Sequence, residues 1–344
     1  MVLEELSIWR LKNGNSDVKV DKEALELLIE NLSGVTETDA RRLIHNAIVK
    51  DQALLHSDIP DVQKAKHELL GQDGLLSFEY ETADFRDVGG LRRLKRWLEV
   101  RRSIFLESNP EVKLDKPKGI LLVGVQGGGK SLAAKAVAGV YGVPLMRLDF
   151  GSLYNKFFGE SEKNMRHALK LAELMSPCVL WIDEIEKGIS SGDYDSGTSQ
   201  RILGSLLTWM AENEKPVFIV ATANKIDALP PELIRKGRLD EIFFVDLPDA
   251  AARAEIFSIH LNKRGITTEQ IDFATLAAHC DGFTGAEIEQ SVVSALYLSH
   301  AVKKSPTTEM LLEELAQTKP LSVVMAEQIA ELRAWASERT VMAD

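Results

Sequence analysis

The sequence predicts an α/β fold, a doubly wound parallel sheet that carries a phosphate-binding loop, flanked by a small N-terminal helical domain and a C-terminal helical domain. Three observations predict this fold. Short, uniformly apolar runs alternate with helical stretches in the middle of the chain, one run leads into a glycine-rich loop, and strand signals are few before residue 81 and stop after residue 248. Uniformly apolar strands are expected in a parallel sheet that helices cover on both faces.

The patterns divide the chain of 344 residues into three parts. Residues 1–80 show helical patterns and predict a small helical domain; a purely structural appendage is an equal alternative, because its content indicates no partner. Residues 81–248 hold the apolar runs and form the predicted α/β domain. Residues 249–344 return to helical patterns and predict a smaller helical domain. The apolar runs are Ile120–Val123, Leu145–Leu148, Cys178–Ile182, Val217–Ala221 and Ile242–Val245.

The first apolar run leads into the sequence G-x-x-x-x-G-K-S over Gly124–Ser131, and an alanine-rich helical stretch, Leu132–Tyr141, follows. A triphosphate needs several backbone N–H groups directed inward at a helix N-terminus, and glycine lets the backbone approach it closely. Lys130 then reaches the β- and γ-phosphates, and the Ser131 hydroxyl is placed to bind magnesium. A plain glycine-rich turn is disfavoured, because both the strand and the helix that the motif requires are present. The glycines of the loop are Gly127, Gly128 and Gly129.

Polar residues end the next two strands. The run Val179–Ile182 is followed by Asp183 and Glu184, which place two carboxylates at the edge where the phosphates are expected. Asp183 is suited to the magnesium shell, and Glu184 to taking a proton from an attacking water. Acidic residues that merely cap a strand are the alternative. Asn224 ends the following strand and is suited to orienting the same water, although asparagine is also common in turns.

Two arginines, Arg235 and Arg238, lie three residues apart on a glycine-containing turn before the last strand. One interpretation is a pair of surface residues in ion pairs. The other is a pair of arginine fingers that reach the γ-phosphate of a neighbouring subunit, an effect worth roughly 10³ to 10⁵ in rate in related chemistry. The sequence alone leaves both open.

In this order, the motifs resemble those of an AAA ATPase of the AAA+ superfamily, from Phe85 to the C-terminal helices. Within that family the chain is similar to the AAA ATPases of an uncharacterised reading frame in algal plastid and cyanobacterial genomes, with a shorter N-terminal region. The resemblance implies a P-loop ATPase domain with a helical lid, which binds ATP and Mg²⁺. It makes Lys130, Glu184, Asn224, Arg235 and Arg238 catalytic, and Ser131 and Asp183 magnesium ligands. The nucleotide contacts it implies come from Asp87, Val88, Gly89, Gln126, Gly127, Gly128, Gly129, Lys130, Ser131, Leu132, Gly285 and Ala286.

The resemblance also implies a ring, usually a hexamer, that hydrolyses ATP at subunit interfaces. In protein-threading rings an aromatic-hydrophobic-Gly segment forms a pore loop, and this segment matches Lys156, Phe157, Phe158 and Gly159. Simple packing of both phenylalanines under the next helix is the alternative. We therefore expect remodelling or disassembly of a protein partner. An ATP-switched scaffold or regulator that assembles with a partner without threading is the alternative function.

The composition of the chain limits which kinds of binding partner and which cellular compartment we expect. The net charge of −11 disfavours general binding to nucleic acid phosphates, which makes a nucleic-acid-dependent ATPase the least favoured function. No apolar run is long enough to cross a membrane. Cys178 and Cys280 show no spacing typical of a metal site or a disulfide framework. These features predict a cytoplasmic protein whose partners are proteins, and the ring that the resemblance implies adds further copies of the same chain.

Overall fold

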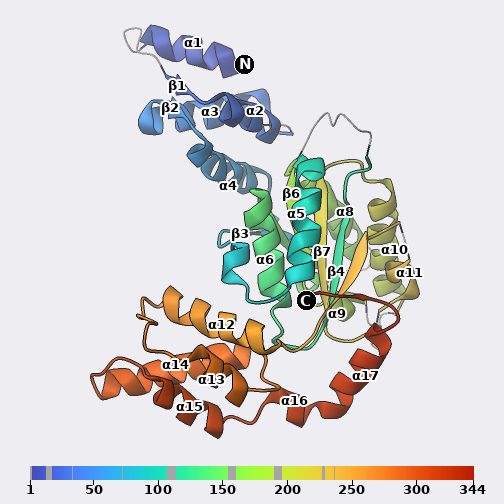
Figure 1. The fold of residues 1–344 in the computed structure, drawn as a ribbon. Helices are drawn as coiled ribbons and strands as arrows, with labels where there is room; N and C mark the ends of the chain where they lie inside the picture. The colour runs from blue at the N-terminus through green and yellow to red at the C-terminus, as the bar shows by residue number, and fades with distance from the viewer. Residues whose placement is uncertain are drawn as a thin grey trace.

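The computed structural model arranges the chain as three stacked parts: N-terminal helices, a central sheet covered by helices, and a helical bundle at the opposite end (Figure 1). It describes residues 2–12, 18–32, 34–71, 73–106, 114–153, 160–189, 196–226, 229–235 and 237–344.

The N-terminal part has its own apolar core, formed by residues such as Leu28, Ile44 and Leu54. Its β1 and β2 pair in parallel as two-residue strands. The last of its helices contacts the central part, where the Nζ of Lys66, 1% exposed, donates to the carbonyl oxygen of Leu174. The elements of this part are α1 (Val2–Lys12), β1 (Lys19–Val20), α2 (Lys22–Asn31), α3 (Glu37–Asp51), β2 (Ala53–Leu54), η1 (His56–Asp58) and α4 (Ile59–Leu70).

The central part is a seven-stranded sheet with the order β3-β5-β6-β7-β4-β8-β9. All neighbours are parallel except β3, which runs antiparallel to β5 at one edge. Every residue of β4, β6 and β7 is buried, which explains why these strands read as uninterrupted apolar runs. The strands are β3 (Leu76–Glu79), β4 (Gly119–Gly124), β5 (Leu145–Leu148), β6 (Cys178–Ile182), β7 (Val217–Ala223), β8 (Glu241–Val245) and β9 (Val341–Met342).

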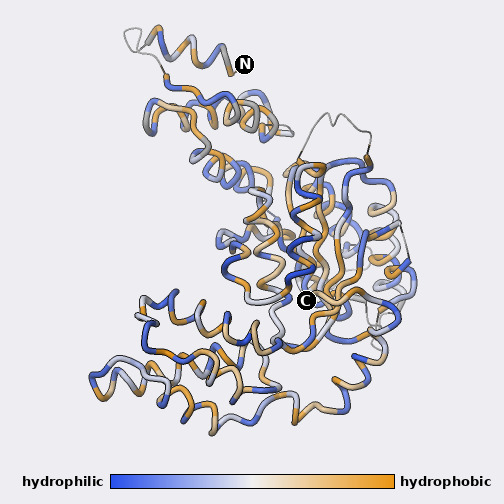
Figure 2. The backbone as a smooth tube through the Cα atoms, viewed as in Figure 1, coloured by the Kyte–Doolittle hydropathy of each residue, from blue (hydrophilic) through white to orange (hydrophobic). Residues whose placement is uncertain are grey.

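Helices cover both faces of the sheet, so the predicted α/β, doubly wound fold is confirmed. Side chains alternate between faces along a strand: Leu121 and Val123 of β4 join the core under α8 and α10, whereas Ile120 and Leu122 join the core under α5 and α6. Figure 2 shows hydrophobic residues concentrated along the central strands. The remaining elements of this part are η2 (Phe85–Asp87), α5 (Arg92–Leu106), α6 (Lys130–Tyr141), α7 (Phe150–Leu153), α8 (Glu160–Leu174), α9 (Ile185–Ile189), α10 (Ser196–Glu212) and α11 (Pro231–Ile234).

Two strands of the seven-stranded sheet, β3 and β9, lie outside the predicted α/β range of 81–248. The expectation that strand signals stop at residue 248 is wrong for β9, which pairs with β8 by Phe243↔Val341 and Phe244↔Met342. Two residues are too few to show a period, and both are exposed. The predicted helical range of 1–80 also contains β3, whose four residues pair along the whole of β5. The exact division into three domains stays a prediction.

The C-terminal part is a bundle of four helices whose core includes Phe257, Leu276, Ile288 and Leu311. Side chains cap the start of each helix, as Thr284 does by accepting from the backbone N–H of Glu287. The bundle helices are α12 (Ala250–Lys263), α13 (Phe273–His279), α14 (Gly285–Ala301) and α15 (Thr308–Gln317).

After the bundle the chain returns to the sheet through α16 (Leu321–Val324) and α17 (Ala326–Ala336). Ile329 and Leu332 of α17 join the sheet core beside α8 and α10, and β9 then adds to the sheet edge. The bundle is therefore attached to the sheet at both of its ends. Across the described ranges, no helix combines the length and apolar character needed to cross a membrane.

Candidate phosphate-binding and acidic site

The glycine-rich loop connects β4 with α6 and turns through two left-handed residues. Gly127 has φ +75° and Gly129 has φ +96°, a conformation that favours glycine. A Cβ atom built on Gly129 would meet nothing within 4 Å, so the loop backbone faces open space there. The loop and the first turn of α6 thus present backbone N–H groups at a helix N-terminus, the arrangement that binds phosphate.

Lys130 begins α6 and is 6% exposed. Its Nζ donates to the carbonyl oxygens of Gly124 at 2.9 Å and Val125 at 2.8 Å, which hold the ammonium over the loop. Burial lowers the pKa of Lys130 to about 8, while the nearby acidic residues, Glu186 foremost, oppose this shift. A buried ammonium group held against the loop backbone is suited to attracting a polyanion such as a triphosphate.

A cavity of about 380 Å³ opens between this loop, the ends of β6 and β7, and the helices α12 and α14 of the C-terminal bundle. It brings together the predicted nucleotide contacts from three distant parts of the sequence, although contact with a nucleotide stays a prediction. Its lining includes Asp87, Val88, Gly89, Gln126, Gly127, Gly128, Gly129, Lys130, Ser131, Leu132, Asp183, Glu184, Asn224, Gly285 and Ala286.

Five further lining residues were missed in the sequence: Thr222, Ile256, Ile259, His260 and Glu289. His260 of α12 lies 3.3 Å from Glu289 of α14, between Nδ1 and Oε1, and burial lowers the pKa of His260. Apolar residues on an amphipathic helix predict a buried face. For Ile256 and Ile259 of α12 this signal does not distinguish a cavity wall from a packed core. The polar residues Thr222, His260 and Glu289 belong to no sequence motif that indicates a binding site.

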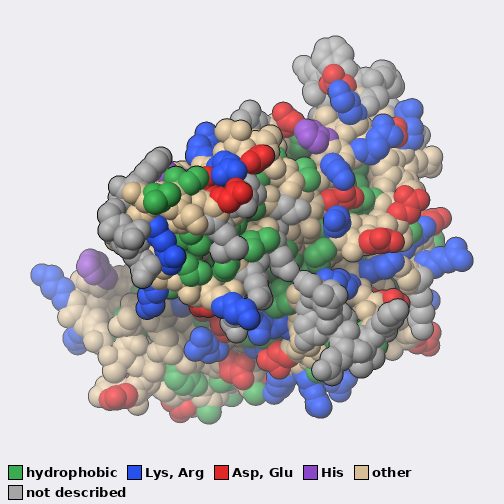
Figure 3. All heavy atoms as spheres, turned by 90° about the horizontal axis from the view of Figure 1, so that it is seen from above, with side chains coloured by type: hydrophobic (Ala, Val, Ile, Leu, Met, Phe, Trp, Pro, Cys, Tyr) green, Lys and Arg blue, Asp and Glu red, His purple; other side chains and the backbone are tan. Residues whose placement is uncertain are grey.

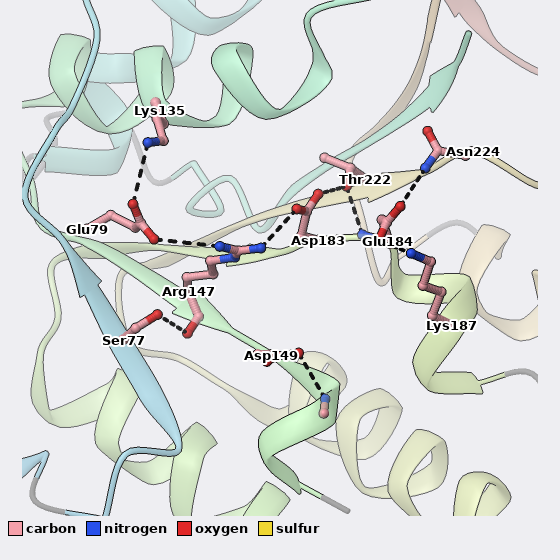
Figure 4. Close-up of polar contacts among 11 residues, drawn as sticks. Ser77, Glu79, Lys135, Arg147, Asp149, Asp183, Glu184, Lys187, Thr222 and Asn224 are labelled. Atoms are coloured by element: carbon pink, nitrogen blue, oxygen red, sulfur yellow. Dashed lines mark hydrogen bonds and ion pairs between the residues drawn. The ribbon is translucent and has the colours of Figure 1, made fainter. Parts of the chain in front are cut away.

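Figure 4 shows the polar side chains at the ends of β6 and β7. The hydroxyl of Thr222 donates to Oδ1 of Asp183 at 2.7 Å and accepts from the backbone N–H of Glu184 at 3.0 Å. Glu184 has φ +47°, a strained conformation for a residue with a side chain. The Thr222 hydroxyl therefore fixes both acidic residues at once.

The Glu184 carboxylate has two partners. Its Oε1 accepts from Nδ2 of Asn224 at 3.1 Å, and its Oε2 pairs with Lys187. A third carboxylate, that of Glu186, is 4% exposed and accepts from the backbone N–H of Asn224 at 2.9 Å. The acid and the amide that the sequence predicted to share one water are therefore in direct contact.

The two predicted arginine fingers, Arg235 and Arg238, lie outside this cavity. Arg235 follows α11 and is exposed, and Arg238 donates from Nη1 to the carbonyl oxygen of Glu232. Neither arginine is among the described residues that line the cavity. The predicted pore-loop residues Lys156, Phe157, Phe158 and Gly159 lie outside the described residues.

The residues present fit ATP and Mg²⁺. The empty space beside Gly129 and the buried ammonium of Lys130 suit a triphosphate. The Ser131 hydroxyl and the Asp183 carboxylate supply the oxygen ligands that Mg²⁺ prefers. Within the described part of the chain, no group of three or more His, Cys, Asp or Glu residues is placed to hold a metal ion.

A phosphate-binding loop after one buried strand, paired acids after a second and a polar residue after a third define a P-loop nucleotide-binding protein. Comparison with known proteins gives the family. The sequence profile of the ATPase family associated with various cellular activities (AAA) matches residues 120–247, and that of the second domain of SpoVK-like AAA ATPases matches residues 1–73.

Curated relatives extend the match to nearly the whole chain. It is 41% identical over 317 residues to the uncharacterized AAA domain-containing protein ycf46 of Guillardia theta, covering 91% of this chain and 63% of that protein. With ycf46 of Trieres chinensis the identity is 38% over 339 residues, covering 98% and 68%. With the proteasome-activating nucleotidase of Aeropyrum pernix it is 35% over 285 residues, covering 79% and 67%.

The chain therefore belongs to the AAA family of ATPases, which confirms the resemblance inferred from its motifs. It spans only about two thirds of the length of these relatives.

Proposed function

We propose that this chain hydrolyses ATP to ADP and phosphate, and that it works as an oligomeric ring, a hexamer, which remodels or disassembles a protein partner. The observation that carries the proposal is the contact between Glu184 and Asn224 at the rim of the cavity that holds Lys130. A proton acceptor and an orienting amide beside a phosphate-binding loop are what attack of water on a terminal phosphate requires.

The residues have separate roles in this proposal. Lys130 and the backbone N–H groups of the loop bind the phosphates, and Ser131 and Asp183 would hold Mg²⁺. When bound, the metal neutralises charge that develops on the phosphate oxygens. Glu184 accepts the proton of the attacking water, and Asn224 orients that water together with the Glu184 carboxylate. Asp87, Val88, Gly89, Gly285 and Ala286 line the side of the cavity formed with the lid, where the nucleoside would lie.

The position of the arginines supports a site shared between subunits. Arg235 and Arg238 stand on the surface, away from the lining of the cavity of their own chain. We propose that they reach the γ-phosphate held by a neighbouring copy. Hydrolysis then depends on assembly, which favours a ring over a monomer.

The protein client rests on the resemblance and on one relative. The proteasome-activating nucleotidase is by name a protein that acts on another protein assembly. In the proposal Phe157, with Lys156 beside it, grips an extended polypeptide in the pore of the ring. An ATP-switched scaffold that binds its partner without threading is the second candidate, and Phe157 would then be dispensable.

Nucleic acid is a weaker candidate for the partner. On the face drawn in Figure 3, Lys and Arg side chains are interspersed with Asp and Glu side chains over the described residues. Proteins that bind nucleic acid phosphates usually gather their basic residues into one patch or stripe. The net charge of −11 points the same way.

The deciding experiment measures the mass in solution of the Glu184→Gln variant with Mg·ATP and with ADP. The amide keeps the size of the side chain and removes the proton acceptor, so ATP is bound without turnover. A hexamer with ATP is the expected result. An exposed-site variant, Glu214→Gln, is the matched control, and it should retain hydrolysis. A Glu184→Gln variant that binds ATP and stays monomeric would overturn the ring, and with it the trans role of Arg235 and Arg238.

A further inference from the structure

We propose that Arg147 is a positioning residue for the acidic site: it fixes Asp183 in the orientation in which that carboxylate receives the magnesium ion of Mg·ATP. The inference rests on the proposed ATP site and names a residue that the motifs do not contain. Arg147 lies on β5, directly opposite Trp181 in the register between β5 and β6. It is the single charged residue of a strand that is otherwise apolar and buried.

The guanidinium of Arg147 lies between two carboxylates (Figure 4). Its Nη2 donates to Oδ2 of Asp183 at 3.3 Å, and its Nη1 is 3.9 Å from Oε1 of Glu79 on β3. The other oxygen of Glu79 pairs with Lys135 of α6 at 3.4 Å. A chain of alternating charges therefore runs from the helix after the phosphate loop, through the edge strand, to the acidic site.

Asp183 is held from both sides. Its Oδ2 accepts from Arg147, on the strand that neighbours β6 on one side, and its Oδ1 accepts from Thr222, on the strand that neighbours β6 on the other. Two donors on opposite oxygens prevent the carboxylate from rotating. Each oxygen keeps a further lone pair with which to accept from a metal-bound water or to bind the metal.

The geometry of Arg147 is hard to explain by packing alone. Its guanidinium stacks over the indole of Trp181, 4.7 Å from the ring centroid. Its Nε is buried and has no hydrogen-bond partner among the described residues. A buried N–H without an acceptor loses its hydrogen bonds to water and gains none in return, which destabilises the folded chain. A methionine or leucine would cover Trp181 without that cost, so the forked charge is the property that the site uses.

Groups that hold a metal-binding carboxylate from behind tune its affinity for the metal. Losing such a partner typically lowers metal affinity or activity about 10–100-fold. Arginine is suited to this role, because its charge is permanent and its planar fork addresses two carboxylates in fixed directions. A lysine in place of Arg147 would keep the positive charge but could not direct two N–H groups at two carboxylates.

The test measures Mg²⁺-dependent binding of a fluorescent ATP analogue to the full chain and to three variants. Arg147→Met keeps an unbranched stem over Trp181 and removes the charge, Arg147→Lys keeps the charge, and Arg166→Met is the control. Arg166 lies on the surface of α8 and pairs with Glu162 of the same helix at 2.9 Å. Affinity is measured against Mg²⁺ concentration and in EDTA, so the readout is binding and not turnover.

We expect Arg147→Met to raise the half-saturating Mg²⁺ concentration about 10–100-fold, with little change in the affinity for the analogue in EDTA. Arg147→Lys should lie between this variant and the wild type, and Arg166→Met should match the wild type. An Arg147→Met half-saturation equal to or below that of the wild type would overturn the inference, because Arg147 would then be neutral toward the metal or compete with it. Should Arg147→Met fail to fold, the same criterion applies to Arg147→Lys.

The outcome also separates this inference from the proposed function. If the wild-type chain does not bind the analogue, the proposed ATP site fails. If it binds the analogue equally with and without Mg²⁺, the proposed magnesium site at Ser131 and Asp183 fails, and the role of Arg147 with it. If the wild type needs Mg²⁺ and Arg147→Met needs no more of it, only the role of Arg147 fails.

Discussion

The Nδ2 of Asn224 donates to Oε1 of Glu184 across 3.1 Å, which links the ends of two neighbouring parallel strands. Asn224→Ala removes this donor and leaves the carboxylate in place. We expect kcat for ATP hydrolysis to fall roughly 10–100-fold, because general-base contributions of 10²–10⁴ depend on alignment of the water. The Kd for ATP should change little. Asn262→Ala, on the surface of α12, is the control; equal loss in both variants, or a changed Kd alone, would contradict the assignment.

The hydroxyl of Thr222 holds both acidic residues of the site, Asp183 and Glu184. Thr222→Val keeps the shape of the side chain and removes the hydroxyl that bonds to Asp183 and to the backbone of Glu184. Because Thr222 is 2% exposed, we expect a loss of about 1–3 kcal/mol in the free energy of unfolding and a strong fall in ATP turnover. Urea unfolding and a phosphate-release assay measure the two effects. Thr222→Ser keeps the hydroxyl and should retain most of both; a Ser variant as impaired as Val would contradict the hydroxyl's role.

The buried amine of Lys66 predicts a pH dependence of stability. Burial lowers its pKa to about 8 in the folded chain, against about 10.4 for an unfolded lysine. Between these values the unfolded chain binds more protons than the folded one, so stability rises with pH over this window. Relative to Lys66→Met, the wild type should gain free energy of unfolding from pH 7 to pH 10, of the order of 3 kcal/mol at most.

Chemical denaturation at both pH values measures that difference. Lys64→Met, which removes an exposed lysine of the same helix, is the matched control. A difference between wild type and Lys66→Met that stays constant from pH 7 to pH 10 would show that Lys66 titrates as an ordinary surface lysine.

Mixed subunits test whether Arg235 acts on a neighbour. Lys130→Ala removes the cation of the phosphate loop, and Arg235→Ala removes the finger, so each variant alone should hydrolyse little ATP. Mixing the two creates interfaces in which an intact loop faces an intact arginine, and activity should reappear. No recovery in verified mixed assemblies would place Arg235 outside the reaction.

A Phe157 variant distinguishes the proposed protein-threading ring from the alternative of an ATP-switched scaffold. Phe157→Ala should leave basal ATP hydrolysis intact and abolish its stimulation by an unfolded protein substrate, because the aromatic ring supplies the grip and not the chemistry. The melting temperature is the control. A large fall in melting temperature together with basal activity would instead mean that Phe157 packs against the helix after it.

The sequence was informative wherever one chemical constraint dominated. Strands such as β6, buried along its whole length, can only read as apolar runs, and the phosphate loop needs glycine at Gly127 and Gly129 for its positive φ. Arg147 left a weaker signal, a lone charge within an apolar strand, which indicates a partner of opposite charge on a neighbouring strand. Its partner Asp183 became evident only once the strand order set β5 beside β6. The edge strand β9 gave no signal, since pairing of two exposed residues depends on the backbone alone.

The C-terminal bundle is attached to the sheet through two connections, which limits how it can move. Residues 246–249 lead from the end of β8 into α12, and α17 and β9 bring the chain back to that same strand. A domain joined to its neighbour by one linker can rotate in many directions, whereas a domain joined by two connections has fewer directions of rotation. The first connection of the bundle follows the end of β8, and the second runs through α17, packed in the sheet core, to β9 at the sheet edge, so the bundle cannot move away from the sheet without disturbing the packing of α17 or the pairing of β9.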